Sequence, residues 1–331
     1  MYKKNTLSDC MDGIAAIVYK PLGEKGEDSF AYDFRRNDVH AQAVFDGCGG
    51  AGAWKYSEYE NATGAFIAAQ SMADIFQRWI EGIDADAFSD TSWLAQSFHD
   101  VSCKRLTDLK DRCSPMELKG SMVKSFPCTA ALALIRRGTG NTIELTALNT
   151  GDSRVYALTP EFGLIQITED DSRGKPKPDP LDSIYDNPRL SMMLNADKPY
   201  TVNHWRIQLS LPCAVLCATD GVFSFLPSPM HFEYVLLKCL TRAQSLHDFE
   251  VRMGKAIVEV THDDSTCIAA FYGWRSLVAM KNCLSARYVL LEDMIRNIDA
   301  QPSPEQKESR IRDIWQRYRQ NSLYYEKWGQ R

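Results

Sequence analysis

The strongest constraint on the fold is a series of short β-type segments that follow one another directly. Residues 129–135, 143–148, 155–158 and 164–167 form apolar runs, and only Gly or polar turns separate them. Parallel strands need a crossover of a dozen or more residues, which these turns are too short to provide. The pattern therefore predicts an antiparallel meander and not a βαβ alternation.

Further strands and helices are expected on both sides of this meander. Three strand-like runs precede it, at 14–18, 29–34 and 39–45. Apolar residues then recur every three or four positions over 57–80, which predicts a long helix, and a second helix begins near Asp90, a candidate N-cap. After the meander we expect strands at 205–209, 214–218 and 265–272 and helices at 232–240 and 246–260.

The pattern changes after Gly273. Two helices are predicted, at about 277–298 and 305–325, joined by the Pro-containing stretch AQPSPE. We therefore divide the chain into a domain over 1–273 and a helical extension over 274–331. Two interpretations of the extension stay open: the hairpin packs on its own domain, or it docks a protein partner.

Charge and hydropathy exclude some classes of partner. The formal net charge of −5 gives no general electrostatic reason to bind nucleic acid or an anionic membrane. No apolar run approaches the roughly 18 residues of a membrane-spanning helix, and the N-terminal residues lack the apolar core of a signal peptide. We expect a cytoplasmic protein with no nucleic-acid or membrane partner.

Acidic residues stand repeatedly at the edges of the predicted buried strands. Carboxylates are costly to bury without a partner, so this repetition suggests a shared cation. Hard oxygen ligands without His or Cys pairs favour Mg²⁺ or Mn²⁺ over zinc. The acids are Glu27 and Asp28, Asp46, Asp220, and Asp263 and Asp264.

A glycine follows two of these acids, in Asp46-Gly47 and Asp220-Gly221. Taken singly, an Asp-Gly pair after a strand is usually a turn. Beside other acids, the glycine would also let the backbone approach a metal closely. The clusters together carry more weight than each one alone.

A competing motif is GCGGAG, residues 47–52, which matches the dinucleotide fingerprint G-x-G-x-x-G. That fingerprint requires an acid about 20 residues further on, at the end of the next strand. The nearest such acid, Asp74, falls inside a predicted helix, and Asp46 would repel a pyrophosphate. A nucleotide site is therefore disfavoured.

Several short motifs occur in an order that resembles one family, the metal-dependent PPM phosphatases, also called the protein phosphatase type 2C family. The resemblance spans residues 12–273. The motifs are GEDSF, VFDGCGG, PCTAALALI, LNTGDSRVYAL, ITEDDS, ATDGVFSFL and HDDSTCIAAF.

The resemblance implies an α+β fold with a central antiparallel β-sandwich, flanked by helices on both faces in four αββα layers and followed here by the C-terminal helical hairpin. It also implies a site for two Mn²⁺ or Mg²⁺ ions at one end of the sandwich. The implied reaction is hydrolysis of phosphoserine and phosphothreonine on a phosphorylated protein substrate, by a water that bridges the two ions.

The resemblance assigns roles to the acids. Asp46 would bridge both ions, Gly47 would offer its carbonyl, and Asp220 and Asp263 would complete the shell of the first ion. The pair Glu27–Asp28 would hold the waters of the second ion. Asp46 and Asp28 are thus the candidate catalytic acids.

The sequence departs from the family pattern at three positions. Cys48 replaces a His that many members use as general acid, and it becomes a candidate proton donor. Gly23 stands where animal-type members carry a phosphate-binding Arg. Lys25 and Arg173 are candidates for that role, and Lys20, Lys175 and Lys177 are alternatives. Lys124 occupies the place of an acid that binds a third metal in some members, so a third ion is doubtful.

Other interpretations remain open. The chain could be a phosphatase fold of weak or no activity that serves as a binding module, or a phosphomonoesterase for a small molecule. The GDSR turn at 151–154 is interpreted as structural, with Asp152 and Arg154 pairing or capping the local backbone. The Pro- and Asp-rich segment 170–199 is too long for a simple connector and is interpreted as functional.

Overall fold

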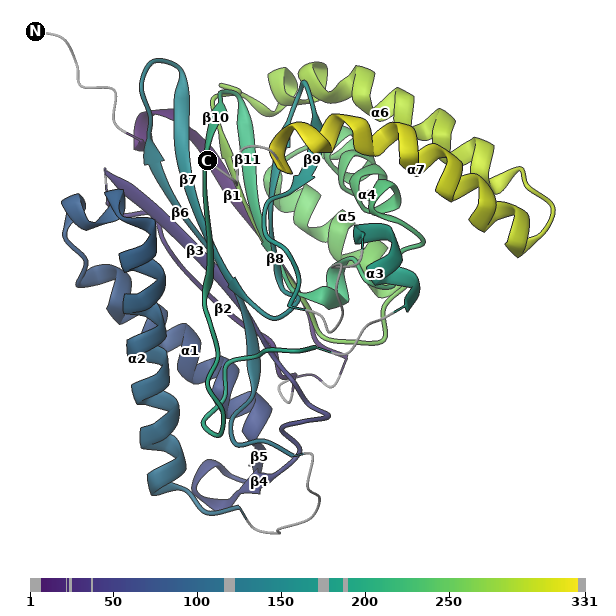
Figure 1. Ribbon diagram of the computed structural model, residues 1–331. Coiled ribbons are helices and arrows are strands. Elements are labelled where there is room, and N and C mark those ends of the chain that lie inside the picture. Colours follow the sequence, from purple (N-terminus) through teal and green to yellow (C-terminus); the bar gives the residue numbers. More distant parts are fainter. Residues whose placement is uncertain are drawn as a thin grey trace, which may run out of the picture.

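The computed structural model describes residues 7–21, 23, 26–36, 38–115, 123–171, 179–186 and 190–326. Within these ranges two antiparallel five-stranded sheets pack face to face, and helices cover the outer face of each (Figure 1). The predicted four-layer α+β architecture is confirmed.

The first sheet contains the strands that lead to Asp46. Its order is β10-β7-β6-β3-β2, and every neighbouring pair is antiparallel. Its strands are β2 (Ser29–Asp33), β3 (Val39–Gly47), β6 (Cys128–Arg137), β7 (Thr142–Thr150) and β10 (Asn203–Ser210).

The second sheet contains the strands that flank Asp220 and Asp263. Its order is β1-β12-β11-β8-β9, again antiparallel throughout. Its strands are β1 (Met11–Tyr19), β8 (Arg154–Thr159), β9 (Gly163–Gln166), β11 (Cys213–Ala218) and β12 (Ser265–Tyr272).

The predicted meander is divided between the two sheets. β6 pairs with β7 in the first sheet, whereas β8 pairs with β9 in the second. The chain changes sheet at Gly151, whose φ of +93° lies in the left-handed region that favours glycine. This turn places Asp152 at the end of the sandwich.

Alternation along β3 shows how one strand serves two layers. Ala43 and Phe45 belong to the apolar cluster beneath the helices of the first sheet, and Val44 belongs to the cluster between the sheets. Successive side chains of a strand point to opposite faces, so a strand covered on both sides is apolar along its whole length.

Helices α1 (Gly64–Glu81) and α2 (Thr91–Arg112) cover the first sheet. The helix predicted from residue 57 begins at Gly64, because Thr63 caps it by accepting a 3.1 Å hydrogen bond from the Phe66 amide. Residues 55–63 instead form the short strands β4 (Lys55–Tyr56) and β5 (Ala62–Thr63) with a turn between them. Asp90 caps α2 as predicted.

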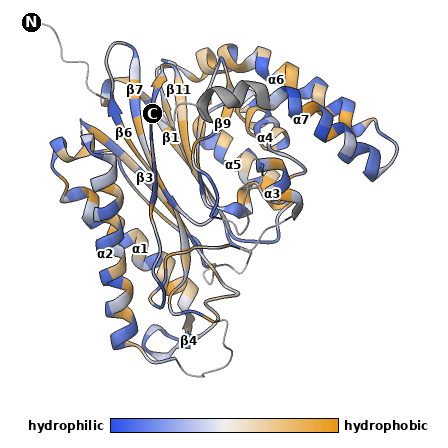
Figure 2. Ribbon diagram, viewed as in Figure 1, coloured by the Kyte–Doolittle hydropathy of each residue, from blue (hydrophilic) through white to orange (hydrophobic). Residues whose placement is uncertain are grey.

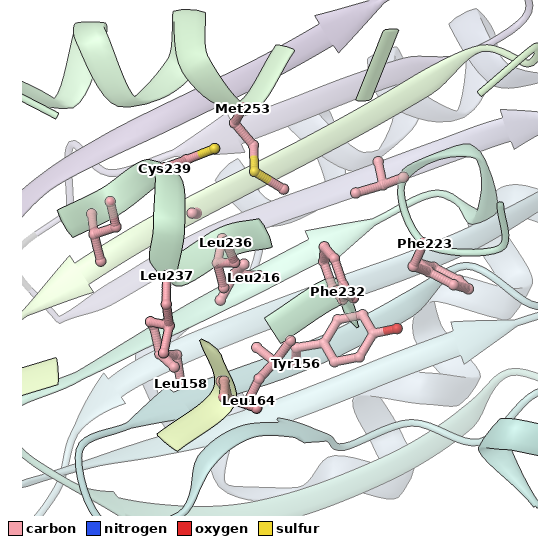
Figure 3. Close-up of a cluster of buried hydrophobic side chains, with 14 of the residues drawn as sticks. Tyr156, Leu158, Leu164, Leu216, Phe223, Phe232, Leu236, Leu237, Cys239 and Met253 are labelled. Carbon is pink, nitrogen blue, oxygen red and sulfur yellow. The ribbon is translucent and has the colours of Figure 1, made fainter. Parts of the chain in front are cut away.

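Helices α4 (Pro229–Arg242) and α5 (Leu246–Val258) cover the second sheet. In Figure 3, Leu236 and Leu237 of α4 and Met253 of α5 lie over the strand residues Leu158 and Leu216. This cluster fixes the strands whose ends carry Asp152 and Asp220.

The C-terminal hairpin consists of α6 (Leu277–Asp299) and α7 (Pro304–Glu326), which lie on the outer side of α4 (Figure 1). Both helices carry hydrophilic and hydrophobic residues (Figure 2), and their apolar residues join the cluster on the second sheet. The predicted hairpin is confirmed, while the domain boundary at residue 273 stays a prediction. Among the described helices, none is long and apolar enough to span a membrane.

Candidate functional site

The acids that the sequence separates by more than 200 residues meet at one end of the sandwich. They surround a pocket of about 300 Å³. Asp46 lies near the end of β3, Asp220 lies two residues after the end of β11, and Asp263 lies two residues before the start of β12. The pocket is lined by Glu27, Asp46, Gly47, Cys48, Gly49, Gly50, Thr129, Asp152, Leu190, Asp220, Asp263 and Asp264.

Asp28 is fully buried beside this pocket. Its Oδ2 accepts a 2.8 Å hydrogen bond from the hydroxyl of Thr219. Thr219 is the residue that precedes Asp220 in the chain. The two remaining predicted site residues, Lys25 and Arg173, lie outside the described residues. The structure thus brings together every predicted metal-site residue that it describes.

At Gly47 the backbone of β3 lies very close to the backbone at Ala65 and at Glu27. A Cβ on Gly47 would lie 2.6 Å from the carbonyl oxygen of Ala65, and the Gly47 amide donates to the Glu27 carbonyl at 3.3 Å. A larger residue would push Asp46 and Glu27 away from each other. The glycine after Asp46 is therefore required by packing around the pocket.

Glu27 is held in place from two sides. The Thr63 hydroxyl donates to its carboxylate, and its own amide donates to the carboxylate of Asp264. Burial raises the pKa of both Glu27 and Asp264 above the usual range. Thr63 also caps α1, so the helix start and the carboxylate position are linked.

The pocket is dominated by like charges. Burial is the main cause that raises the pKa of Asp46 well above its usual value, and the neighbouring Asp220 and Asp28 raise it further. Asp220 has its pKa raised by burial and by Asp263. The carboxylates therefore repel one another in a region of low dielectric constant, which disfavours the fully ionised state.

The chemistry of this donor set fits a divalent cation. Asp28 Oδ1, Asp152 Oδ1 and Asp264 Oδ1 are buried and accept no hydrogen bond within the described part of the chain. Buried carboxylate oxygens normally have partners, so these oxygens are free to bind an ion. Among the described residues, no three acidic, His or Cys side chains are placed so that they could hold a metal ion as they stand. The fit therefore rests on burial, charge and unpaired oxygens.

Asp152 is a pocket residue that the sequence interpretation missed. It lines the pocket, and burial followed by the charge of Asp220 raises its pKa well above the usual value. The proposed pairing with Arg154 is wrong: the Arg154 guanidinium instead binds both carboxylate oxygens of Asp170, at 2.8 and 2.6 Å. The available signal was the Gly-Asp turn between strands, which resembles the other acid positions.

Arg154 is a buried cation whose charge acts on the pocket acids Asp152 and Asp220. Its side chain is buried, and its guanidinium lies 4.1 Å from the ring centroid of Phe223, three residues after Asp220. It also partly offsets the raised pKa values of Asp152 and Asp220. The GDSR turn thus contributes one pocket acid and one supporting cation.

Cys48 and Lys20 are two further polar groups near the acids. Burial, and then the charge of Asp46, raises the pKa of the Cys48 thiol well above its usual value, so the thiol keeps its proton at neutral pH. Lys20 donates to the carbonyl of Gly26, next to Glu27, at 3.3 Å. It lies at the edge of the acid group.

Comparison with known proteins identifies the class of fold. No protein-family profile matches the sequence, and no curated protein matches it. Solved structures match with high probability, and the fold is that of the PPM-type serine/threonine phosphatases. The class that the motifs predicted is confirmed at the level of the fold.

Three of these structures illustrate the similarity. The serine/threonine phosphatase Stp1 from Staphylococcus aureus is 16% identical, with a TM-score of 0.59 over 82% of this chain and 98% of Stp1. The PPM phosphatase MsPP from Mycobacterium smegmatis, in complex with cacodylate, is 14% identical, with a TM-score of 0.53 over 79% and 98%. The catalytic domain of the phosphatase PstP, in complex with two manganese ions, is 17% identical, with a TM-score of 0.52 over 78% and 97%.

Proposed function

We propose that this chain is a metal-dependent phosphatase that hydrolyses phosphoserine and phosphothreonine esters on proteins. The observation that supports it most is the group of buried, mutually repelling carboxylates around one pocket, in a fold shared with PPM phosphatases. A structural role would pair these acids with cations of the chain. Acids that form no ion pair with the described residues and line one pocket suit an external cation.

The residues that would hold two Mn²⁺ or Mg²⁺ ions are Asp46 and the Gly47 carbonyl, with Asp220 and Asp263, and with the pair Glu27–Asp28 acting through water. PstP, which has the same fold, was crystallised with two manganese ions. When bound, such ions supply a nucleophilic water at neutral pH and neutralise charge on the phosphoryl oxygens. We propose two ions and not three, because Lys124 offers no carboxylate.

The chain's own groups prepare the site for this chemistry. Thr63 and Thr219 orient Glu27 and Asp28 through their hydroxyls, so these carboxylates need little rearrangement. Cys48 holds a proton at the pocket wall, from which it could protonate the leaving alkoxide. Arg154 holds the turn that carries Asp152.

Two substrates with different leaving groups test both the reaction and the role of Cys48. Hydrolysis of a phosphothreonine peptide and of an aryl phosphate is measured in the presence of Mn²⁺, Mg²⁺ or a chelator, for the wild type and for Asp46→Asn. We expect turnover that needs metal and is lost in Asp46→Asn. Activity that is unchanged by the chelator, or no activity with any of the metals, would refute the proposal of a metal-dependent enzyme. Hydrolysis of the aryl phosphate without hydrolysis of the phosphothreonine peptide would indicate a small-molecule substrate.

Replacing Cys48 by Ser tests proton donation separately. General acids contribute about 10²-fold or more to rate when the leaving group is a poor one. Cys48→Ser should therefore slow hydrolysis of the alkyl phosphate in the peptide much more than hydrolysis of the aryl phosphate. Equal slowing of both, or none, would remove Cys48 from this role.

A further inference from the structure

The C-terminal hairpin contacts a short helix, α3 (Pro180–Asp186), inside the long segment between β9 and β10. The Trp315 indole of α7 donates a 2.7 Å hydrogen bond from Nε1 to Asp179 Oδ1. Arg312 of α7 lies 2.9 Å from Asp182 Oδ1 as an ion pair. Two polar contacts thus join α7 to the start of α3.

Apolar packing accompanies these contacts. Leu181 of α3 is buried, and it belongs to the same apolar cluster as Ile311, Ile314 and Trp315 of α7. The Arg312 guanidinium also lies 5.1 Å from the ring centroid of Tyr185. The hairpin therefore forms a surface on which α3 rests.

The position of α7 is itself fixed to the second sheet. Glu233 of α4 is fully buried and binds Arg287 of α6 through two hydrogen bonds, at 2.8 and 2.9 Å. The Tyr318 hydroxyl of α7 donates to the same carboxylate. A Cβ on Gly163, at the start of β9, would lie 2.6 Å from Arg287 Nε, so the strand leaves room for this group.

The other side of α3 leads to the acid pocket. Leu190 lines the pocket and follows the last residue of α3 by four positions, through residues 187–189 outside the described part of the chain. The Ser191 amide donates to the Asp171 carbonyl at 2.8 Å, and the Asp171 amide donates to Gly151 at 2.9 Å, beside Asp152. Segments before and after α3 therefore meet next to a pocket acid.

We propose that α7 positions the Leu190 wall of the acid pocket by holding α3, with Trp315 and Arg312 as the positioning residues. This inference rests on the proposed phosphatase function and gives the C-terminal hairpin a part in it. The hairpin acts as an internal brace for the segment that borders the substrate. Loosening it displaces Leu190 and leaves the metal-binding acids in place.

A charge swap tests the brace through activity. Arg312 and Asp182 are each 44% exposed in their side chains, so substitutions there leave the fold intact. Arg312→Glu and Asp182→Arg should each lower kcat/KM for a phosphothreonine peptide by about tenfold, because small misplacements in a site are costly to rate. The double variant Arg312→Glu/Asp182→Arg should recover most of the loss.

The matched control is Glu308→Gln, which removes the other ionic partner of Arg312, 3.1 Å away on α7 itself. It should leave kcat/KM and the melting temperature unchanged. Single variants with wild-type kcat/KM, or a double variant without recovery, would overturn the proposal.

Hydrogen exchange tests the brace without relying on activity. Trp315→Phe keeps a smaller aromatic ring at this position and removes the N–H donor. It should speed exchange of the Leu181 and Ser183 amides, which bind Asp179 at 2.9 and 2.8 Å, and of Ser191. The Leu194 amide, bonded to the Cys128 carbonyl, should be unaffected.

The two measurements separate the two ideas. A wild-type chain without phosphatase activity would refute the proposed function, and the exchange pattern would still decide whether α7 braces α3. Unchanged exchange at Leu181, Ser183 and Ser191 in Trp315→Phe would overturn the brace even if the enzyme is active.

Discussion

Two groups of buried charged residues in this molecule differ in how their charge is balanced. Under the C-terminal hairpin, the fully buried Glu233 binds Arg287 through both carboxylate oxygens and accepts from Tyr318. At the end of the sandwich, Asp46 and Asp220 face other carboxylates, and burial and repulsion raise the pKa of each. Within the described residues, the first group is neutralised by an ion pair, whereas the acids of the second form no ion pair with a cation.

The difference separates a structural role from a functional one. A buried carboxylate with a bidentate Arg partner is satisfied in the folded chain and fixes the elements that carry it. Buried carboxylates that face one another cost folding energy, and a fold retains them at functional sites where a ligand removes that cost. The two groups should therefore respond in opposite ways to loss of an acid.

The largest effect is expected for Asp220→Asn at the acid pocket. Activity should fall by about a thousandfold, because metal ions contribute several kcal/mol to the barrier. The metal-free protein should unfold at the same or higher urea concentration, because a repelling charge has been removed. Steady-state kinetics and urea unfolding in chelator check the two parts. Lower stability in the metal-free variant would mean that Asp220 is structural.

Glu233→Gln should give the reverse result. Removing one partner of a buried ion pair leaves Arg287 uncompensated, at a cost of about 3 kcal/mol in the free energy of unfolding. Activity of the folded protein should fall far less than in Asp220→Asn. Glu259→Gln, an exposed glutamate at the end of α5, serves as control. A stability loss no larger than that of Glu259→Gln would contradict the structural role of the Glu233 group.

The smallest effect is a pH dependence confined to the acid pocket. Burial raises the pKa of Asp28 in the folded chain above the value of about 3.9 in the unfolded chain, so the folded state binds the proton more tightly. Protonated Asp28 therefore stabilises the folded state fully below the pKa of the unfolded chain, and this stabilisation is lost as the pH rises toward neutrality. Without metal, the free energy of unfolding of Asp28→Asn minus that of the wild type should therefore increase by about 1 kcal/mol or more from about pH 5 to about pH 7. Urea unfolding at both pH values checks this, and a constant difference would contradict it.

Much of the fold could be predicted because strand signals depend on local sequence. The strand at Ser265–Tyr272 and the hairpin helices agree closely with the predicted ranges. The start of α1 could not be predicted, because it depends on Thr63 and on a hydrogen bond from Gly64 to the Trp54 carbonyl. Helix α3 lies in a Pro- and Asp-rich segment with too few apolar residues to show a helical period. Its buried residue packs against α7, a contact between segments far apart in the sequence.

The convergence of the acids could be anticipated from their common place at strand ends, together with the resemblance of the motifs. Asp152 was missed because its partner was sought nearby, whereas Arg154 binds Asp170, 16 residues further on. The change of sheet at Gly151, which brings Asp152 to the pocket, depends on pairing between strands and not on the turn itself.

Binding of Mn²⁺ to the metal-free protein tests the central claim most directly, since it asks whether the unpaired acids hold a cation. Titration calorimetry should detect about two ions per chain in the wild type, as in two-metal phosphatases, and the melting temperature should rise as sites fill. Asp46→Asn should lose this binding, while Glu233→Gln should keep it. A wild type that binds no Mn²⁺ at millimolar concentration, or an Asp46→Asn variant that binds it equally well, would contradict the account.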